Sequence, residues 1–134
     1  MTVTWNQDEI ERRIRQSAMQ GVLIGAHLVL ETGTKKLNEG GKSGRVYRRR
    51  GVEHQASAPG EAPATDTGRL VGSGDVYADP ANTSARINWS AAHARPLELG
   101  TEEIEPRPFA RPSLAENADA IRKAVGDRVA ASLK

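Results

Sequence analysis

The hydrophobic positions of the first forty residues recur at the spacing of an α-helix. Asn6 followed by Glu9 is typical of a capped helix start, and Gly40-Gly41 is typical of a stop. We therefore predict a helix over about 7–38, roughly 45 Å long at 1.5 Å per residue. The apolar or small positions that carry the pattern are Ile10, Ile14, Ala18, Gly21, Val22, Gly25, Leu28, Val29 and Thr32.

Two glycines inside this helix, Gly21 and Gly25, are spaced by four residues. Such a pair permits the close approach of another helix or a bend. A second apolar stripe near the end of the chain predicts a helix over about 113–133, with Ser113 as the candidate N-cap. The stripe consists of Leu114, Ala118, Ile121, Val125, Val129 and Leu133.

The region between the two helices, about 42–112, shows strand and turn signals instead. Residues 44–52 combine β-favouring side chains with several arginines, which predicts an edge strand. Alternating residues predict a hairpin formed by 75–78 and 84–89, which turns at 79–82.

In the rest of this region, proline and glycine separate a loop from short helical segments. Residues 55–64 form a Pro/Ala/Gly loop of a length that usually signals function or mobility. We expect a short helix at 67–73, capped by Asp66 or Thr67, and a short helix or irregular segment at 91–99.

This order of elements predicts an α+β fold. A long N-terminal helix and a C-terminal helix would pack on a small antiparallel β-sheet, with a long Pro/Gly/Ala loop at its edge. A chain of 134 residues is expected to form one domain over 1–134.

Composition narrows the picture further. Leu, Ile, Val and Phe together fall just below a fifth of the chain, but 19 basic residues nearly cancel 17 acidic ones. Disorder usually needs high net charge as well as low hydrophobicity, so a folded domain with a thin core is favoured, helped by association with other chains. The absence of cysteine excludes a disulfide framework and a thiolate metal site.

Targeting signals are also missing from the sequence. The longest apolar stretch, 21–30, has about half the ~20 residues of a membrane span and contains His27. No basic region followed by an apolar run begins the chain, so we expect a soluble protein made in the cytoplasm, with no membrane partner. A pI of about 9.2 with a net charge of +2 is weak support for nucleic-acid binding.

Catalytic patterns are not indicated. The three histidines, His27, His54 and His93, do not stand at metal-ligand spacing, and no serine has a nucleophile-elbow context. Glu53 beside His54 allows a hydrolase interpretation, but it lacks a nucleophile partner. We therefore expect no enzyme activity, no metal and no cofactor. Four carboxylates crowd one segment and favour a solvated acidic loop: Glu98, Glu102, Glu103 and Glu105.

The densest basic cluster is 42–50, which contains Lys42 and four arginines. Alternation along a strand would put Arg48 and Arg50 on one face and Arg49 on the other. Nucleic-acid binding by this strand is the alternative function that we consider, although Tyr47 is the only nearby aromatic side chain for base stacking.

A basic strand and an acidic loop on one nearly neutral domain also suggest self-association. If 42–50 and the acidic loop at 98–105 occupy opposite flanks, head-to-tail pairing of identical copies would close a ring. This expectation comes from the order of charges along the chain.

Two stretches of the chain, the second of which consists of two segments, have a distinctive pattern of Pro and Gly. The first is Ser57-Ala-Pro-Gly-Glu-Ala-Pro-Ala-Thr-Asp-Thr-Gly-Arg-Leu70. The second is Ala94-Arg-Pro-Leu-Glu-Leu-Gly-Thr101, followed by Arg107-Pro-Phe-Ala-Arg-Pro-Ser-Leu114. Proline fixes φ and glycine permits positive φ, so both stretches predict shaped loops. Phe109, the only phenylalanine, lies between prolines and suggests a docking plug, and we expect it to be buried by its own domain or by a neighbouring chain.

The three segments, in this order and spacing, resemble the tail-component or neck family of long-tailed bacteriophages. The family carries Ser-Ala-Pro-Gly-x-x-Pro-x-x-Asp-Thr-Gly-x-Leu, then Tyr-Ala-x-x-x-Glu-x-Gly-Thr, then Arg-Pro-Phe-x-x-Pro-x-Leu. The similarity covers about 43–114, over half the chain. One departure is Ala92-His93-Ala94, which stands where the family usually shows Tyr-Ala.

The resemblance implies a structural virion protein of a phage, a prophage or a related particle such as a gene transfer agent. Such a protein lies at the head–tail junction as a ring, for which we expect a hexamer, between head-completion and tail-terminator or tail-tube rings. DNA would pass through the ring without sequence-specific binding. The interface residues that we predict are Arg48, Arg50, Ser57, Pro59, Gly60, Pro63, Asp66, Glu98, Glu102, Glu103, Pro108 and Phe109.

Overall fold

The computed structural model describes residues 2, 4–39, 42–64 and 68–134. It confirms an α+β fold with a long first helix and small antiparallel sheets. The helices are α1 (Gln7–Glu39), α2 (Arg69–Gly72), α3 (Ala94–Leu99), α4 (Ala110–Glu116) and α5 (Ala118–Ser132). The strands are β1 (Val46–Arg49), β2 (Val52–Gln55), β3 (Gly74–Asp79) and β4 (Ser84–Trp89), with a 3₁₀ turn at Pro80–Asn82 between β3 and β4.

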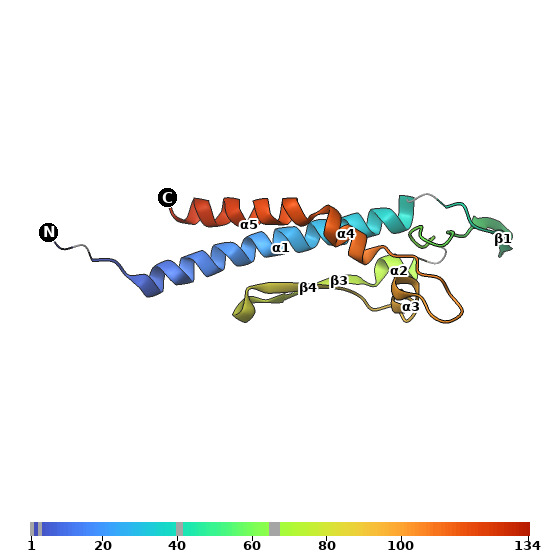
Figure 1. The fold of residues 1–134 in the computed structure, drawn as a ribbon, viewed down its shortest axis with the longest axis horizontal. Helices are drawn as coiled ribbons and strands as arrows, with labels where there is room; N and C mark the ends of the chain where they lie inside the picture. Colours follow the sequence, from blue (N-terminus) through green and yellow to red (C-terminus); the bar gives the residue numbers. More distant parts are fainter. Residues whose placement is uncertain (1, 3, 40–41, 65–67) are drawn as a thin grey trace.

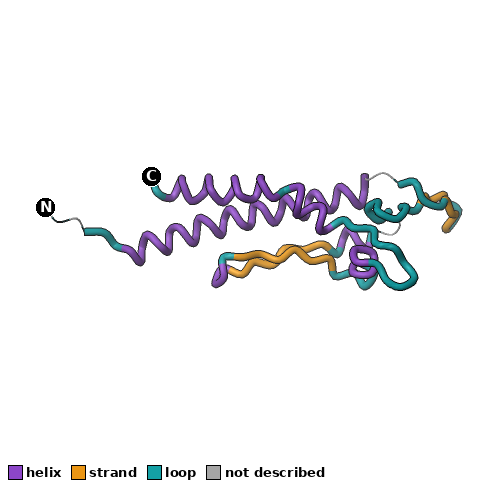
Figure 2. The backbone as a smooth tube through the Cα atoms, viewed as in Figure 1, coloured by secondary structure: helices purple, strands orange, loops and turns teal. Residues whose placement is uncertain are grey.

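Helix α1 runs through the middle of an elongated molecule (Figure 1). Helix α5 packs along one side of α1, and the β3–β4 hairpin lies along the other side (Figure 2). The β1–β2 hairpin lies beyond the C-terminal end of α1, at one end of the long axis (Figure 1). The N-terminal segment lies at the opposite end.

The predicted start of α1 is confirmed by its cap. The side-chain oxygen of Asn6 accepts a hydrogen bond of 3.1 Å from the backbone N–H of Glu9, which satisfies one of the free donors at a helix start. Glycines then let α5 approach closely. A Cβ at Gly21 would lie 2.5 Å from the Cα of Val125, and one at Gly25 would lie 2.8 Å from a side-chain carbon of Ile121.

The β3–β4 hairpin confirms the second strand prediction. Gly74 pairs with Trp89 and Asp79 with Ser84, around the predicted turn. Exposure alternates along β4, with Ala85, Ile87 and Trp89 on the half-buried face. This period of two lays one face of the hairpin on α1 and leaves the other in solvent.

The main core lies where the hairpin, α1 and the C-terminal region meet. It is built from Leu37, Leu70, Ala94 and Phe109. The ring of Trp89 meets the ring of Phe109 edge to face, with centroids 5.1 Å apart and planes at 83°, a favoured arrangement for aromatic pairs.

Three local predictions need correction. Residues 52–55 form strand β2, whereas the sequence suggested the end of one strand and the start of a loop. Ser113 is not an N-cap, because α4 begins at Ala110 and Ser113 lies inside it, donating its hydroxyl to the carbonyl of Phe109. The N-cap of α2 is Gly68, without a side-chain hydrogen bond; the predicted caps Asp66 and Thr67 lie outside the described residues.

Candidate functional site: the end that carries the basic hairpin

The three segments behind the family resemblance meet in space, although they lie far apart in the sequence. Arg107 donates from its guanidinium to the hydroxyl of buried Ser57 at 3.3 Å. The N–H of Gly60 donates to the carbonyl of Pro106 at 3.1 Å. Leu70 of the first segment joins the same apolar cluster as Phe109 of the third. The segments therefore form one structural unit.

Glu98, in the middle segment, holds the start of α4. One carboxylate oxygen accepts from the N–H groups of Phe109 (2.7 Å) and Ala110 (3.0 Å), and the other accepts from Arg111 (2.9 Å). The first N–H groups of a helix have no partner within the helix, and a negative charge beside them is favourable. Glu98 is therefore a cap supplied from eleven to thirteen residues away.

The loop after β2 is held by a second carboxylate, that of Glu61. It accepts from the N–H of Ala58 at 2.8 Å and from the N–H and hydroxyl of Ser43 at 2.9 and 2.5 Å. These bonds, first that from Ala58, lower the pKa of Glu61 to about 2. The loop at 57–64 is thereby fastened to the segment that leads into β1.

Lys42 fastens the same loop to the end of α1. Its ammonium donates to the carbonyls of Ala62 (2.7 Å), Pro63 (2.8 Å) and Lys36 (3.3 Å). Burial lowers the pKa of Lys42 below its usual 10.5, and the nearby Glu61 carboxylate opposes that shift. Lys42 thus serves the internal structure, whereas the sequence grouped it with the basic strand.

The β1–β2 hairpin projects from this anchored base. Its strands pair from Val46–Gln55 to Arg49–Val52, and all of their residues except His54 are exposed. Arg50 and Gly51 form the two-residue turn with φ of 52° and 79°. Both residues are left-handed, as in the type I′ turn that suits the twist of a hairpin. Arg50 therefore lies at the tip, whereas the sequence placed it within a strand.

The structure divides the predicted interface residues into two groups. Ser57, Pro63 and Phe109 are buried, and Pro108 and Glu98 are half-buried. The second group is exposed and consists of Arg48, Arg50, Pro59, Gly60, Glu102 and Glu103. Asp66 lies outside the described residues.

Of the two outcomes predicted for Phe109, burial by its own domain is confirmed, and the docking-plug interpretation is corrected. Its side chain is 1% exposed and packs in the core of its own chain. The sequence signal was a lone aromatic in a proline-rich segment, and such a segment can equally lead into a core. The cap formed by Glu98 was missed as well, because nothing local links it to α4.

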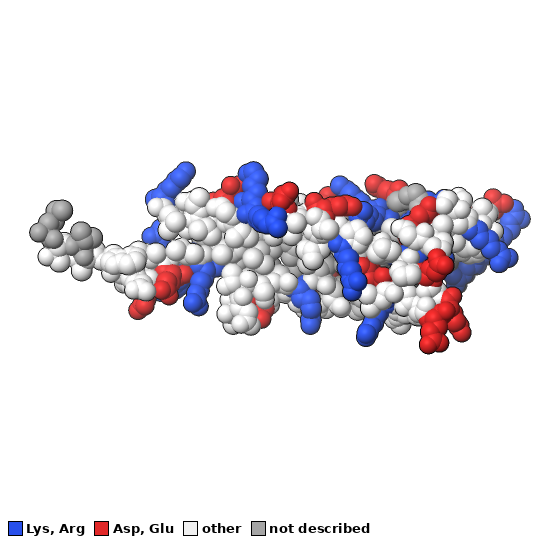
Figure 3. Space-filling view, viewed as in Figure 1, with Lys and Arg blue, Asp and Glu red and all other residues white. Residues whose placement is uncertain are grey.

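The charge-based ring pairing stays a prediction. The basic hairpin and the acidic loop that follows α3 both lie toward the same end of the long axis (Figures 1 and 3). Arg48 is also 3.7 Å from Glu53 within its own hairpin. Glu98, at the start of the acidic segment, is engaged with α4.

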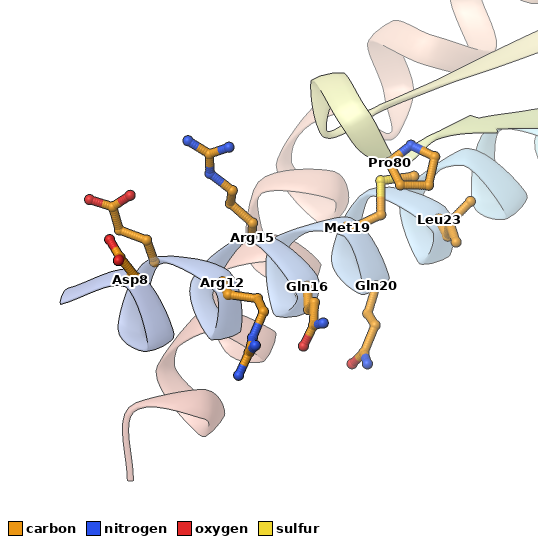
Figure 4. A pocket seen from close by; sticks show the side chains of 9 residues that line it. Asp8, Arg12, Arg15, Gln16, Met19, Gln20, Leu23 and Pro80 are labelled. Carbon is orange, nitrogen blue, oxygen red and sulfur yellow. The ribbon is translucent and has the colours of Figure 1, made fainter. Parts of the chain in front are cut away.

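A separate groove on the surface shows no convergent chemistry. A groove of about 590 Å³ runs along α1 beside Pro80. In Figure 4 the side chains of Arg12 and Gln16 point away from that of Arg15, so the polar groups do not meet at one point. Within the described ranges, no group of three His, Cys, Asp or Glu side chains could hold a metal ion. None of the helices described there has the length and apolar character of a membrane span.

Comparison of the chain with protein-family models, with curated proteins and with solved structures finds no match.

Proposed function

We propose that this protein is a structural component of the head–tail junction of a long-tailed phage or a related particle. It would assemble as a ring of copies around the DNA channel and join or complete the tail. Its partners would be its own copies and the rings above and below. We propose no catalytic step, and the location would be the virion.

One observation carries the proposal: the three resembling segments form one unit through residues that the motifs share. Glu98 belongs to the Glu-x-Gly-Thr segment and holds the Arg-Pro-Phe segment through three N–H groups. Ser57 opens the first segment and accepts from Arg107, which opens the third. Mutual contacts of this kind explain why these residue types occur together, which makes a chance resemblance less plausible.

The mechanism would be geometric. The unit around Phe109 forms a stiff base, and exposed loop residues such as Pro59, Gly60, Glu102 and Glu103 lie beside it. Loops held on a rigid base can match a neighbouring ring without ordering at each contact, which lowers the entropic cost of assembly. The thin core is consistent with a protein that gains stability from association.

The proposal is tested in the particle itself. In a replicating phage or prophage that carries this coding sequence, its deletion should give filled heads and separate tails in electron micrographs. Expression in trans should restore joining, and gold-labelled antibody should mark the junction. Normal joined particles after deletion, or label only on heads or tail tips, would contradict the proposal.

A second candidate function, binding of the phosphate backbone of nucleic acid, is favoured by the β1–β2 hairpin. Arg48 and the tip residue Arg50 are exposed on an element that projects from the end of the molecule (Figure 3). Stacked rings of Tyr47 and His54, 5.7 Å apart, lie on the opposite face of the same hairpin from Arg48, the face that Arg49 shares. Basic side chains beside an aromatic surface are typical of non-specific strand binding.

The salt dependence of DNA binding distinguishes this second candidate function from the purely structural one. Fluorescence anisotropy with labelled duplex DNA should show affinity that falls steeply with added salt, and the logarithmic slope should change by about 0.9 for each phosphate that the protein neutralises. Arg48→Glu with Arg50→Glu should make the slope shallower, whereas Arg128→Glu, a reversal at an exposed site on α5, should not. Equal slopes for the two variants would exclude the hairpin.

A further inference from the structure

The acidic loop that follows α3 is held in a fixed shape by its own backbone. The hydroxyl of Thr101 accepts from the N–H groups of Glu103 (3.2 Å) and Ile104 (3.1 Å). The N–H of Thr101 donates to the carbonyl of Ile104 at 2.8 Å. Just after this turn, the carbonyl of Pro106 accepts from the N–H of Gly60 at 3.1 Å. A loop that is fixed in this way loses little conformational freedom when it binds a partner.

This loop presents negative charge around one apolar side chain. Ile104 is 40% exposed. Three exposed carboxylates flank it along the chain: Glu102, Glu103 and Glu105. Arg95 on α3 and Arg111 on α4 are also exposed, but within the described ranges no ion pair links either of them to these carboxylates. The described residues therefore leave the charge of the loop uncompensated.

The β1–β2 hairpin, toward the same end of the molecule, presents the opposite charge (Figure 3). Arg48 pairs across the strands with Glu53, and Val46 pairs with Gln55, so these four side chains share one face. Arg50 follows at the tip. Glu53 is the only carboxylate on the two strands, and it lies 3.7 Å from Arg48 with both side chains mostly in solvent. Such a pair is weak, so this face and the tip stay basic beside a valine that is 56% exposed.

The basic hairpin and the acidic loop do not meet within one chain. No ion pair joins them in the part of the chain that the structure describes, and both are fastened to the anchored base. The chain also exposes 9253 Å², whereas a compact monomer of 14.4 kDa exposes about 6,800 Å². The excess is larger than the about 800 Å² that each partner buries in a standard interface. Surface area and charge therefore both favour association with another chain.

We propose that the acidic loop of one copy binds the β1–β2 hairpin of a second copy. Glu102 and Glu103 would face Arg48 and Arg50, and Ile104 would pack on Val46. An apolar centre inside a polar rim is the usual anatomy of an interface. A second copy is the occupant because each chain carries one loop and one hairpin, and a net charge of only +2 keeps the overall repulsion between copies small. The inference rests on the proposed function, because it names the surfaces through which copies of the ring would join.

The test begins with self-association of the full chain, measured by sedimentation velocity over a concentration series in about 0.05 M and about 0.5 M salt. The wild type should associate, and more weakly at the higher salt, because salt screens exposed charges. Wild-type chains that stay monomeric up to about 1 mM at low salt would overturn the proposal.

Reversal of the hairpin charge gives the first variant. Arg48→Glu with Arg50→Glu, the hairpin variant, places like charges opposite each other and should weaken association by about tenfold or more at low salt. Arg122→Glu with Arg128→Glu is the matched control, since it changes the net charge equally at exposed sites on α5. The control should associate as the wild type does. Equal loss in the two variants would overturn the proposal, because only net charge would then matter.

Reversal of the loop charge gives the second variant. Glu102→Lys with Glu103→Lys, the loop variant, should weaken association as much as the hairpin variant. If reversal at Arg50 disturbs the hairpin turn, the loop variant decides alone. Glu53→Gln should act in the opposite direction and tighten association, because it removes a carboxylate that competes for Arg48. Normal association of the folded loop variant would overturn the proposal.

The combined variant, which carries all four reversals in one chain, gives the sharpest result. Its acidic hairpin again faces a basic loop, so it should recover association to within about threefold of the wild type. It should not associate with wild-type chains, because its acidic hairpin would then meet an acidic loop. Fluorescence anisotropy of labelled wild-type chain measures this sorting. A combined variant that is folded by circular dichroism and associates no better than the hairpin variant would overturn the contact.

Nucleic acid is the competing occupant of the hairpin. The hairpin variant should lose duplex DNA if the arginines bind phosphates, but the loop variant should not. If DNA binding falls in the hairpin variant while the hairpin and loop variants both associate as the wild type does, the hairpin serves nucleic acid and the proposed contact is wrong.

Failure of this inference and failure of the proposed function give different results. If the hairpin and loop variants associate normally, yet deletion of the coding sequence separates heads from tails, the contact is wrong and the junction role stands. If the combined variant recovers association, yet antibody label is absent from the head–tail junction, the contact stands and the junction role is wrong.

Discussion

Two antiparallel hairpins in the described part of the chain are used in opposite ways. The β3–β4 hairpin lies on α1, with Ile87 and Trp89 turned inward. The β1–β2 hairpin projects beyond the helices and exposes Val46, Tyr47 and Val52. Both are short, and a lone two-stranded hairpin is only marginally stable in water. The structure therefore uses one hairpin as part of the scaffold and presents the other.

The difference follows from side-chain pattern and not from strand propensity. In β4, small or apolar residues occupy every second position, which gives one face to bury. In β1 the sequence is Val-Tyr-Arg-Arg, and neither face is purely apolar. The β1–β2 hairpin therefore leaves β-favouring side chains in solvent on both faces.

The largest expected effect is a loss of stability in the core on which the β3–β4 hairpin packs. Phe109→Ala removes the ring that packs against Trp89 and should lower the free energy of unfolding by about 3–5 kcal/mol, because a buried phenylalanine leaves a cavity. Urea denaturation followed by circular dichroism measures this. Tyr47→Ala on the projecting hairpin is the control and should cost no more than about 0.5 kcal/mol. Similar destabilisation of the two variants would remove the distinction between the hairpins.

A second change removes the cap that Glu98 supplies to α4, next to the same core. Glu98→Gln keeps the shape but removes the charge that faces three N–H groups, and should cost about 1–2 kcal/mol, as removal of a charge-assisted cap does. Glu102→Gln changes an exposed carboxylate four residues on and should be neutral. Chemical denaturation of the two variants compares them, and a neutral Glu98→Gln would mean that solvent replaces this cap easily.

The base of the projecting hairpin should respond to acid. The folded-state pKa of Glu61 is about 2, below the usual 4.5, so its contribution is complete above about pH 4.5 and is lost as the pH falls toward 2. Ser43 and Ala58 should then lose protection of their amides, as followed by nuclear magnetic resonance. In Glu61→Gln those amides should show no such pH dependence, whereas the amides of β3 should be indifferent in both proteins. Loss of amide protection in β3 over the same pH range would mean that the stabilities of the two hairpins are coupled.

The smallest expected effect concerns the tip of the β1–β2 hairpin. Arg50 has φ of 52°, a left-handed conformation that asparagine adopts more readily than arginine. Arg50→Asn should stabilise the hairpin by less than about 1 kcal/mol and slow hydrogen exchange at Val52, without a change in the melting temperature of the whole chain. Faster exchange would mean that the arginine side chain itself holds the turn.

Elements with a local signal were predictable from the sequence. Asn6 and the apolar repeat predicted α1 nearly to its last residue, and alternation predicted β3 and β4. Strand β2 was not predictable, because Glu53 and Gln55 are weak strand formers and the pairing with β1 depends on a turn that begins with arginine.

The candidate site was predictable only in part. The three motif segments were found from proline and glycine, but their meeting depends on bonds between distant residues, such as that of Arg107 to Ser57. The burial of Phe109 required knowing that Trp89, twenty residues earlier, would face it. Exposure of Arg48 and Glu102 agrees with the charge pattern, but their positions at the same end could come only from the three-dimensional path of the chain.

The glycines of α1 have a consequence for how this chain can change in length. Gly21 and Gly25 face α5, and Gly33 faces Trp89, at contacts where a side chain would not fit. Removing one residue between Gly21 and Gly33 would turn one set of glycines by about 100° relative to the other, since a helix has 3.6 residues per turn. Losing or adding residues before Ile10 shifts only the free start of the helix, because the contact of α1 with α5 begins where Arg13 donates to the carbonyl of Ser132. Natural length variation should therefore gather at the start of α1 and be excluded from its middle.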